Sequence, residues 1–208
     1  IKSGAEIVMG VLCLKAGGYW VNNAQKHLTN HQSCTVLFDA DTGQPAVFLS
    51  ANYLTAMRTA AVAGLATDYL AKPDASVMGI IGAGLQALFQ IEAVHTVRPI
   101  SKLLIASRTK QSAEALVGHA RALGIEEVRV ATAEEAASNA DVLTTVTPAT
   151  TPVIENQWVQ AGTHINAMGS DTVGKRELDG AVLKRAQVYV DTWAQAARVG
   201  ECQHGVAE

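Results

Sequence analysis

The chain has 208 residues, a net charge of -3 and no excess of basic residues. Hydrophobic residues make up 49% and charged residues 17%, a balance typical of a folded globular protein rather than a disordered or membrane-spanning one. The composition gives no basic surface for nucleic acid. It predicts no membrane partner either, because the longest apolar run, 77–81, is too short to span a bilayer. The length suits one large domain or two small ones.

The first four residues lack a methionine, a charged segment and an apolar segment, so we expect an internal start and no signal peptide there. Cys13, Cys34 and Cys202 form neither an even set nor a C-x-x-C motif, which favours a reducing cytoplasmic location. His27 and His31 lie near Cys34, but no fourth ligand is evident. We therefore predict no metal site.

Residues 1 to about 50 are predicted to be rich in β-structure. Two strand-like runs, 35–38 and 46–49, flank the turn-forming segment 39–45, which indicates a hairpin. The apolar spacing that follows becomes helical and the segment is rich in alanine. This helix is expected to end at 72–74, where a proline stands.

Strands and helices then alternate, which predicts a parallel sheet covered on both faces. The predicted strands are 77–81, 103–106, 128–131, 142–146, 164–168 and 188–191. The predicted helices are 85–97, 110–122 and 133–139. We therefore predict an α/β fold, with a Rossmann-type doubly wound parallel sheet and a smaller β-rich domain.

A glycine loop follows the first of these strands. Gly82, Gly84 and Ala87 form the pattern G-x-G-x-x-A between a strand and a helix. In such a loop the first glycine permits a tight turn, the second lets the backbone approach a pyrophosphate, and the alanine allows close helix packing. The helix N-terminus offers free N–H groups and a positive dipole end to phosphates. The pattern alone is weak, but its context favours a nicotinamide cofactor over a purely structural turn.

The segment after the next strand bears on the choice of cofactor. An NAD site usually carries an acid about 20 residues past the loop. This chain instead has Ser107, Arg108, Thr109 and Lys110 there. Two cations and two hydroxyls suit a 2′-phosphate, which Arg108 can bind in a forked geometry. We therefore favour NADP(H), with NAD(H) and a solvated basic helix start as the alternative.

Several stretches resemble the ornithine cyclodeaminase/mu-crystallin family. They are Asp39–Pro45 (DADTGQP), Leu54–Ala61 (LTAMRTAA), Gly79–Ala87 (GIIGAGLQA), Ala167–Asp179 (AMGSDTVGKRELD) and the late pair Gly200-Glu201. These stretches are spread over nearly the whole chain, and their order and spacing match the family. Residues 14–20 (LKAGGYW) and 30–33 (NHQS) are most similar to imine-reducing members of the family.

The resemblance implies roles for individual residues. Lys15 and Arg58 match the cations that hold a substrate carboxylate, and Asp171 matches the acid that serves the reacting nitrogen or water. Asp171 and Lys15 are thus the catalytic candidates, and His31 is expected to line the substrate pocket. The residues matched to cofactor binding are Gly82, Ala83, Gly84 and Gln86 of the phosphate loop, Ser107, Arg108 and Thr109 of the ribose segment, and Thr145, Val146, Thr147, Met168 and Gly169 beside the nicotinamide.

Each of these assignments has a structural alternative. Asp171 follows the predicted strand 164–168, at a sheet edge where partial desolvation raises the pKa of a carboxyl group toward that of a general acid. The alternative is a turn or N-cap aspartate. Arg58 lies among small residues and can pair bidentately with a carboxylate, or it forms a surface salt bridge. For Lys15 the alternative is a solvated strand lysine.

Three functions follow from the resemblance. We favour an NAD(P)H-dependent imine reductase, or in reverse an amino-acid dehydrogenase, that acts on a small α-imino acid with an open choice of side chain. The second is an ornithine cyclodeaminase that recycles tightly held NAD, against which the segment 107–109 argues. The third is a non-enzymatic NADPH-binding protein similar to a crystallin, against which Lys15, Arg58 and Asp171 argue.

The β-rich first segment resembles the dimerisation domain of the family. The expected boundaries are 1–58 for a substrate and dimerisation domain with its linking helix, 59–191 for the Rossmann domain, and 192–208 for a return to the first domain. We expect a homodimer formed through residues 1 to about 50 and the segment from about 192, because pairing would cover an open strand edge. Chains of the family are longer at both ends, and their first segment supplies an arginine that nothing here matches.

Overall fold

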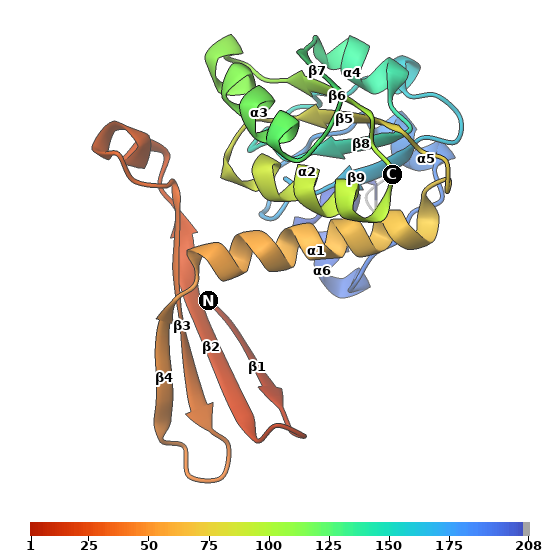
Figure 1. The fold of residues 1–208 in the computed structure, drawn as a ribbon. Coiled ribbons are helices and arrows are strands. Elements are labelled where there is room, and N and C mark those ends of the chain that lie inside the picture. The colour runs from red at the N-terminus through yellow and green to blue at the C-terminus, as the bar shows by residue number, and fades with distance from the viewer. Residues whose placement is uncertain (206–208) are drawn as a thin grey trace. The chain divides into compact units, whose positions relative to one another are not determined.

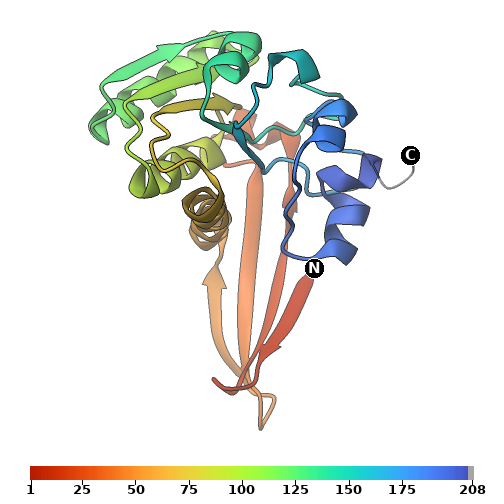
Figure 2. The ribbon, with the colours of Figure 1, turned by 90° about the vertical axis from the view of Figure 1, so that its right-hand side faces the viewer.

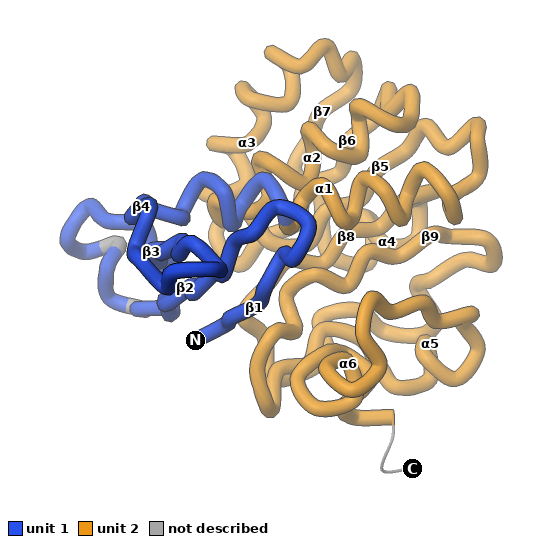
Figure 3. Tube along the Cα trace, turned by 90° about the horizontal axis from the view of Figure 1, so that it is seen from below, with its two compact units in different colours: residues 1–58 blue, residues 59–208 orange. Residues whose placement is uncertain are grey.

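The structure is a computed structural model in which residues 1–205 are described. The chain divides into two compact units, 1–58 and 59–208, shown in blue and orange in Figure 3. By this division the segment from residue 192 belongs to the second unit. The last part of the predicted return, 206–208, lies outside the described residues.

The first unit contains a four-stranded antiparallel sheet (Figure 1). Its strands are neighbours in chain order: β1 (Lys2–Glu6), β2 (Val11–Tyr19), β3 (His31–Asp39) and β4 (Pro45–Ser50), with the 3-10 helix η1 (Val21–Lys26) between β2 and β3. The predicted hairpin is confirmed as β3 and β4. Asp39 fixes its turn by accepting the N–H groups of Asp41 at 3.1 Å and Thr42 at 2.8 Å.

Helix α1 (Asn52–Leu70) runs from the first unit into the second. It ends as predicted before Pro73, because proline disfavours a helical conformation in the residue before it. The buried guanidinium of Arg98 caps this end by donating to the main-chain oxygens of Asp68 at 2.6 Å and Ala71 at 3.2 Å. Arg98 also pairs with the Asp68 carboxylate at 3.0 Å. These bonds satisfy carbonyl groups that a helix end leaves without partners.

The second unit contains a five-stranded parallel sheet in the order β7-β6-β5-β8-β9. Its strands are β5 (Val77–Ile81), β6 (Lys102–Ala106), β7 (Glu127–Val130), β8 (Val142–Thr145) and β9 (His164–Ala167), and the intervening helices are α2 (Leu85–Val97), α3 (Lys110–Ala122) and α4 (Ala133–Asn139). The predicted doubly wound α/β fold is confirmed. The strand order reverses between β5 and β8, and open sheets of this kind bind ligands beyond the carboxyl ends of the strands at such a point.

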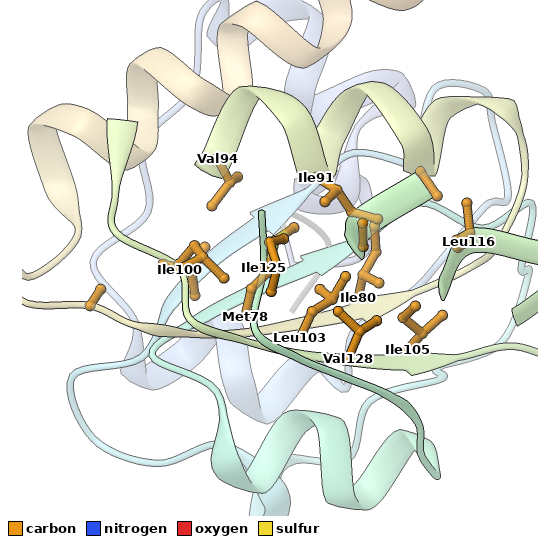
Figure 4. Packing of buried hydrophobic residues seen from close by; sticks show 14 of the residues in the cluster. Met78, Ile80, Ile91, Val94, Ile100, Leu103, Ile105, Leu116, Ile125 and Val128 are labelled. Carbon is orange, nitrogen blue, oxygen red and sulfur yellow. The ribbon is translucent and has the colours of Figure 1, made fainter. Parts of the chain in front are cut away.

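The core of the second unit lies on both faces of this sheet. Figure 4 shows the cluster on the face covered by α2 and α3. On one face Met78 and Ile80 of β5 pack with residues of α2 and α3, and on the other Ile81 packs with residues of α4. Full burial of one such side chain contributes about 1.5–3 kcal/mol. Gly79 brings α4 close, since a Cβ there would lie 2.5 Å from the Ala136 carbonyl oxygen.

One predicted strand, 188–191, is wrong. Residues 188–190 have no regular secondary structure and pair with no strand, and Val188, Tyr189 and Val190 are 45%, 59% and 41% exposed. Their β-branched and aromatic side chains favour an extended backbone, but a strand also needs a partner, and β9 ends the described sheet. The C-terminal part instead forms α5 (Gly180–Arg185), α6 (Trp193–Val199) and the 3-10 helix η3 (Glu201–His204), which Figure 2 shows in blue at one side of the second unit. A further 3-10 helix, η2 (Asn156–Trp158), precedes β9.

Among the described residues, no helix combines the length and the apolar character that crossing a bilayer requires.

Candidate functional site

The parallel strands bring the predicted cofactor residues to one edge of the sheet in the second unit. Because β5, β6, β8 and β9 run in the same direction, their carboxyl ends share that edge. Three backbone hydrogen bonds join neighbouring ends: Gly82 N to Ala106 O at 2.9 Å, Val146 N to Ile81 O at 2.9 Å, and Met168 N to Thr145 O at 2.8 Å. The loops that begin at residues 82, 107, 146 and 168 therefore start beside one another.

The two glycines of the glycine loop differ in what the fold requires of them. Gly82 has a φ of +110°, and a Cβ there would lie 2.7 Å from the Val146 carbonyl oxygen. The fold itself therefore requires glycine at this position. Gly84 has a φ of -86° and a ψ of -175°, an extended conformation that any residue can adopt, and a Cβ there would meet nothing within 4 Å. The space over Gly84 is open.

The start of α2 fits a phosphate group. Gly84 is the N-cap residue and has no side chain, so no side-chain cap covers the first N–H groups of the helix. The Oε1 atom of Gln86 in the same turn is buried and has no hydrogen-bond partner among the described residues. Buried polar atoms in proteins are usually paired. An uncapped helix start with a positive dipole end and an open approach suits the pyrophosphate of a dinucleotide. The unpaired Gln86 oxygen only accepts hydrogen bonds, so it suits a hydroxyl or amide group of such a ligand and not its phosphates.

The ribose segment follows β6 directly. Arg108 is exposed and forms no hydrogen bond or ion pair within residues 1–205. Its neighbours have partners, since Thr109 Oγ1 donates to Ser112 Oγ at 2.6 Å and Lys110 pairs with Glu114 at 3.5 Å. Glu114 is the first acid after β6 and lies one turn into α3. No carboxylate therefore stands where an NAD site usually has one.

A buried carboxylate joins the ends of β8 and β9. Glu177 is fully buried. Its Oε1 accepts the N–H of Thr147 at 2.6 Å and the hydroxyl of Thr147 at 2.7 Å. Its Oε2 accepts the hydroxyl of Thr145 at 2.8 Å and the N–H of Gly169 at 2.7 Å. Burial raises the pKa of Glu177, and these hydrogen bonds act in the opposite direction. Each carboxylate oxygen accepts one backbone N–H, a group that can only donate. This arrangement suits the ionised carboxylate, in which both oxygens are acceptors.

A second buried acid holds the segment that carries Glu177. Glu201 in η3 is 8% exposed and accepts the N–H groups of Glu177 at 3.0 Å and Leu178 at 2.7 Å. Neither acid has a role that the sequence alone predicts. Glu177 stands in the charged run KRELD, which is typical of a solvent-facing segment. Glu177 belongs to the family stretch 167–179 and Glu201 to the pair Gly200-Glu201, so the family resemblance was the one signal available for both acids.

The loop after β9 presents Asp171 to solvent. Its side chain is 68% exposed, and Oδ1 pairs with Lys175 Nζ at 2.5 Å. The partial desolvation expected for this carboxyl group is not found. The loop itself is held, because Ser170 Oγ donates to Lys175 O at 2.9 Å and Gly174 N donates to Gln203 Oε1 at 2.8 Å. Asp171 is thus an exposed acid on an anchored loop that begins at the carboxyl edge of the sheet.

The two predicted substrate cations lie in the first unit. Lys15 Nζ on β2 donates to Thr55 Oγ1 on α1 at 2.6 Å. Burial lowers the pKa of Lys15, and the positive charges of Arg58 and Lys2 lower it further. Within residues 1–205 neither Lys15 nor Arg58 forms an ion pair with a carboxylate. Two neighbouring cations without a carboxylate can accept an external anion.

His31 begins β3 and lies opposite Tyr19 of β2. Its role at a substrate pocket stays a prediction. Within the described part of the chain, no group of three or more His, Cys, Asp or Glu residues is placed to hold a metal ion.

Comparison with known proteins identifies the family. The sequence profile of the Ornithine cyclodeaminase/mu-crystallin family matches residues 4–208. The chain belongs to this family. The resemblance inferred from the sequence stretches is therefore confirmed.

Similar members of the family include imine-reducing proteins. The iminosuccinate reductase of Paracoccus denitrificans is 41% identical over 208 residues, which are 99% of this chain and 64% of that protein. Its crystal structure in complex with NAD⁺ has a TM-score of 0.90 at 40% identity and covers 99% of this chain and 63% of its own. The predicted resemblance to imine-reducing members is thereby confirmed.

Two further solved structures are similar over most of this chain. An archaeal alanine dehydrogenase, described as a dimer with bound NAD, has a TM-score of 0.90 at 40% identity and covers 96% of this chain and 62% of its own. The Δ1-pyrroline-2-carboxylate reductase of Thermococcus litoralis, in complex with NADH and L-proline, has a TM-score of 0.88 at 33% identity and covers 94% and 62%. The chain spans less than two thirds of the length of each of these relatives.

Proposed function

We propose that the protein is an NAD(P)H-dependent imine reductase, or in reverse an amino-acid dehydrogenase, that acts on small α-imino or α-amino acids. The observation that supports this proposal most is the open, uncapped start of α2 at the same sheet edge as the ends of β8 and β9, which hydrogen bonds to Glu177 hold together. The names of the similar proteins support it, since each describes the reduction of an imine or the oxidation of an amino acid.

In this proposal the chain binds and orients the substrate and supplies a proton. Lys15 and Arg58 bind the substrate carboxylate. Asp171 donates a proton to the imine nitrogen, and Lys175 holds its carboxyl group at the end of the loop. The bound nicotinamide supplies the hydride that reduces the imine carbon, so one C=N bond becomes a CH–NH unit. Holding both reactants in one geometry is the main task of the protein.

A panel of 2-oxo acids, each mixed with ammonia, tests the proposed reaction by the loss of NADPH or NADH absorbance. We expect steady consumption of reduced cofactor with at least one small 2-oxo acid. Release of ammonia from L-ornithine without net change in the cofactor would identify a cyclodeaminase instead. Tight cofactor binding without turnover of any substrate would identify a binding protein.

We propose further that the cofactor is NADP(H). The unpaired Arg108 and the absence of an acid over residues 107–113 support this preference. The similar structures contain NAD⁺, NAD or NADH. The proposed preference for NADP(H) therefore rests on residues 107–113 of this chain and not on those structures.

An Arg108→Ala variant is expected to raise KM for NADPH by roughly 10- to 100-fold, because charge-assisted hydrogen bonds contribute about 1.5–3 kcal/mol. KM for NADH should stay within about twofold, since NADH has no 2′-phosphate for Arg108 to bind. Steady-state kinetics with both cofactors measures the difference. Arg121→Ala, in the last turn of the helix α3 that follows Arg108, serves as the matched control and should change neither value. An equal rise of KM for both cofactors would contradict the preference.

Binding of the substrate carboxylate is expected to weaken at alkaline pH. The lowered pKa of Lys15 means that its ammonium loses its proton at a lower pH than an exposed lysine does. The inhibition constant of a non-reacting 2-oxo acid, which has no titrating nitrogen, should therefore rise as the pH passes upward through that pKa. In Lys15→Arg the rise should disappear, because guanidinium keeps its charge. The same alkaline rise in both proteins would remove Lys15 from the site.

We propose that residues 1–58 form the substrate and dimerisation domain and that two copies of the chain pair through its sheet. One face of that sheet carries exposed apolar side chains, with Leu12 39%, Leu14 36% and Phe48 73% exposed. Leu12 lies opposite Phe38, and Val36 links Leu14 to Phe48 across the strands. A dimer would cover this face. Sedimentation velocity should show a dimer that Phe48→Asp converts to a monomer.

A further inference from the structure

We propose that Glu177 is a positioning residue that sets the ends of β8 and β9 for the nicotinamide half of the cofactor. The inference rests on the proposed function, with the nicotinamide beside Thr145, Thr147 and Gly169 as the family resemblance implies. Glu177 itself is fully buried and touches these residues rather than the ligand. It therefore acts through the strand ends.

The carboxylate of Glu177 is matched to both strand ends. Each of its oxygens accepts one backbone N–H, from Thr147 on one side and from Gly169 on the other. Each also accepts one hydroxyl, from Thr147 and from Thr145. A carboxylate has acceptor sites for all four groups and donates to none of them. No neutral side chain of the same shape can replace it without leaving a donor unpaired.

The packing around Glu177 leaves no room for adjustment. A Cβ on Gly169 would overlap the carbonyl oxygen of Thr147 and lie 2.6 Å from the Glu177 carboxyl group. The two strand ends and the carboxyl group are thus in direct contact. Glu201 in turn accepts the backbone N–H of Glu177, so the main chain that carries the carboxylate is also fixed. A change in the hydrogen bonding of Glu177 must move Thr147 or Gly169.

Glu177 also closes the loop that carries Asp171. The hydrogen bond from Gly169 N to Glu177 Oε2 joins the first and last residues of the segment 169–177. The same side chain thereby determines where this loop leaves the sheet. It is the one described side chain that bonds to the ends of both β8 and β9 and to the loop of the proposed proton donor.

Glu177→Gln is the direct test. In either orientation of the amide, its NH₂ group faces the backbone N–H of Thr147 or of Gly169, and one of them must shift. We expect the affinity for NADPH and NADH to fall by roughly tenfold, as for a lost hydrogen bond to a charged group. The affinity for 2′-phospho-ADP-ribose and ADP-ribose, which lack nicotinamide, should change by less than about twofold. Isothermal titration calorimetry measures all four ligands without turnover.

A control variant separates positioning from general stability. Asp141 accepts the N–H groups of Ser76 and Val77, both at 3.0 Å, at the opposite, amino end of the same sheet. Asp141→Ala should lower the unfolding temperature but leave the affinity for all four ligands unchanged. If Glu177→Gln does not fold, Thr145→Val replaces it, because Thr145→Val removes one buried hydroxyl donor to Glu177. Its affinity for NADPH and NADH should fall by a smaller factor, and its affinity for the two fragments should not change.

The outcomes separate this inference from the proposed function. Loss confined to the dinucleotides supports the positioning role of Glu177. Equal loss of dinucleotides and fragments in Glu177→Gln, or in Thr145→Val, overturns it while the cofactor site stands. A wild-type protein that binds neither dinucleotides nor fragments overturns the proposed function and this inference with it.

Discussion

A Gly84→Ala variant is expected to bind NADPH and NADH roughly 10- to 100-fold more weakly than the wild-type protein, a loss of about 1.4–2.8 kcal/mol. The reason is steric, because a dinucleotide pyrophosphate approaches the backbone where this glycine has no Cβ. The added methyl group would point into the open space over Gly84. Fluorescence titration of the reduced cofactor measures the affinity.

The same Gly84→Ala variant should unfold close to the wild-type temperature. Its extended backbone accepts alanine without strain, and the lower entropy of the unfolded chain offsets the poorer N-capping by alanine. Gly82→Ala is the contrasting variant. Its positive φ and the Val146 carbonyl oxygen at 2.7 Å from the new Cβ predict a loss of about 1–3 kcal/mol in the free energy of unfolding. Unchanged cofactor affinity in Gly84→Ala would mean that the loop has only a structural role.

An Asp171→Asn variant is expected to lower kcat for imine reduction by about 100- to 10,000-fold, the usual contribution of a positioned general acid. The amide keeps the shape of the side chain but has no acidic proton to give. The amide also loses the ion pair with Lys175. Because the Asp171 side chain is exposed, this ion pair contributes about 1 kcal/mol or less to stability. Cofactor affinity should not change. Single-turnover kinetics with saturating cofactor isolates the chemical step.

The matched control for Asp171→Asn is Asp179→Asn. Asp179 is the N-cap of α5, where its side chain accepts the N–H of Ala181 at 3.0 Å, and asparagine caps helices equally well. We expect wild-type turnover from this variant. Full turnover by Asp171→Asn would show that another group or water donates the proton.

Much of the second unit could be predicted because its local signals agree with one another. The apolar strand 77–81, the glycine loop after it and the end of α1 before Pro73 are each predicted from adjacent residues. The structure agrees with all three predictions. The parallel arrangement of the strands follows from the alternation of strands and helices. The wrong strand, 188–191, had the right residue types but no partner in the described sheet.

The parts of the site that could not be predicted depend on contacts between distant residues. Glu177 bonds to Thr145, which is 32 residues away, and Glu201 bonds to Glu177 across 24 residues. A sequence motif shows the identity of an acid but not whether it faces solvent or a buried set of N–H groups. For the same reason the sequence predicted partial desolvation for Asp171, whereas the buried carboxylates are Glu177 and Glu201.

A crystal structure of the protein grown with NADPH tests most directly whether the start of α2 is the cofactor site. We predict density for the pyrophosphate over Gly84, against the N–H groups of Leu85 and Gln86, with the 2′-phosphate within hydrogen-bond distance of Arg108. Pyrophosphate density at any other place, or a protein side chain that fills the space over Gly84, would contradict the proposal.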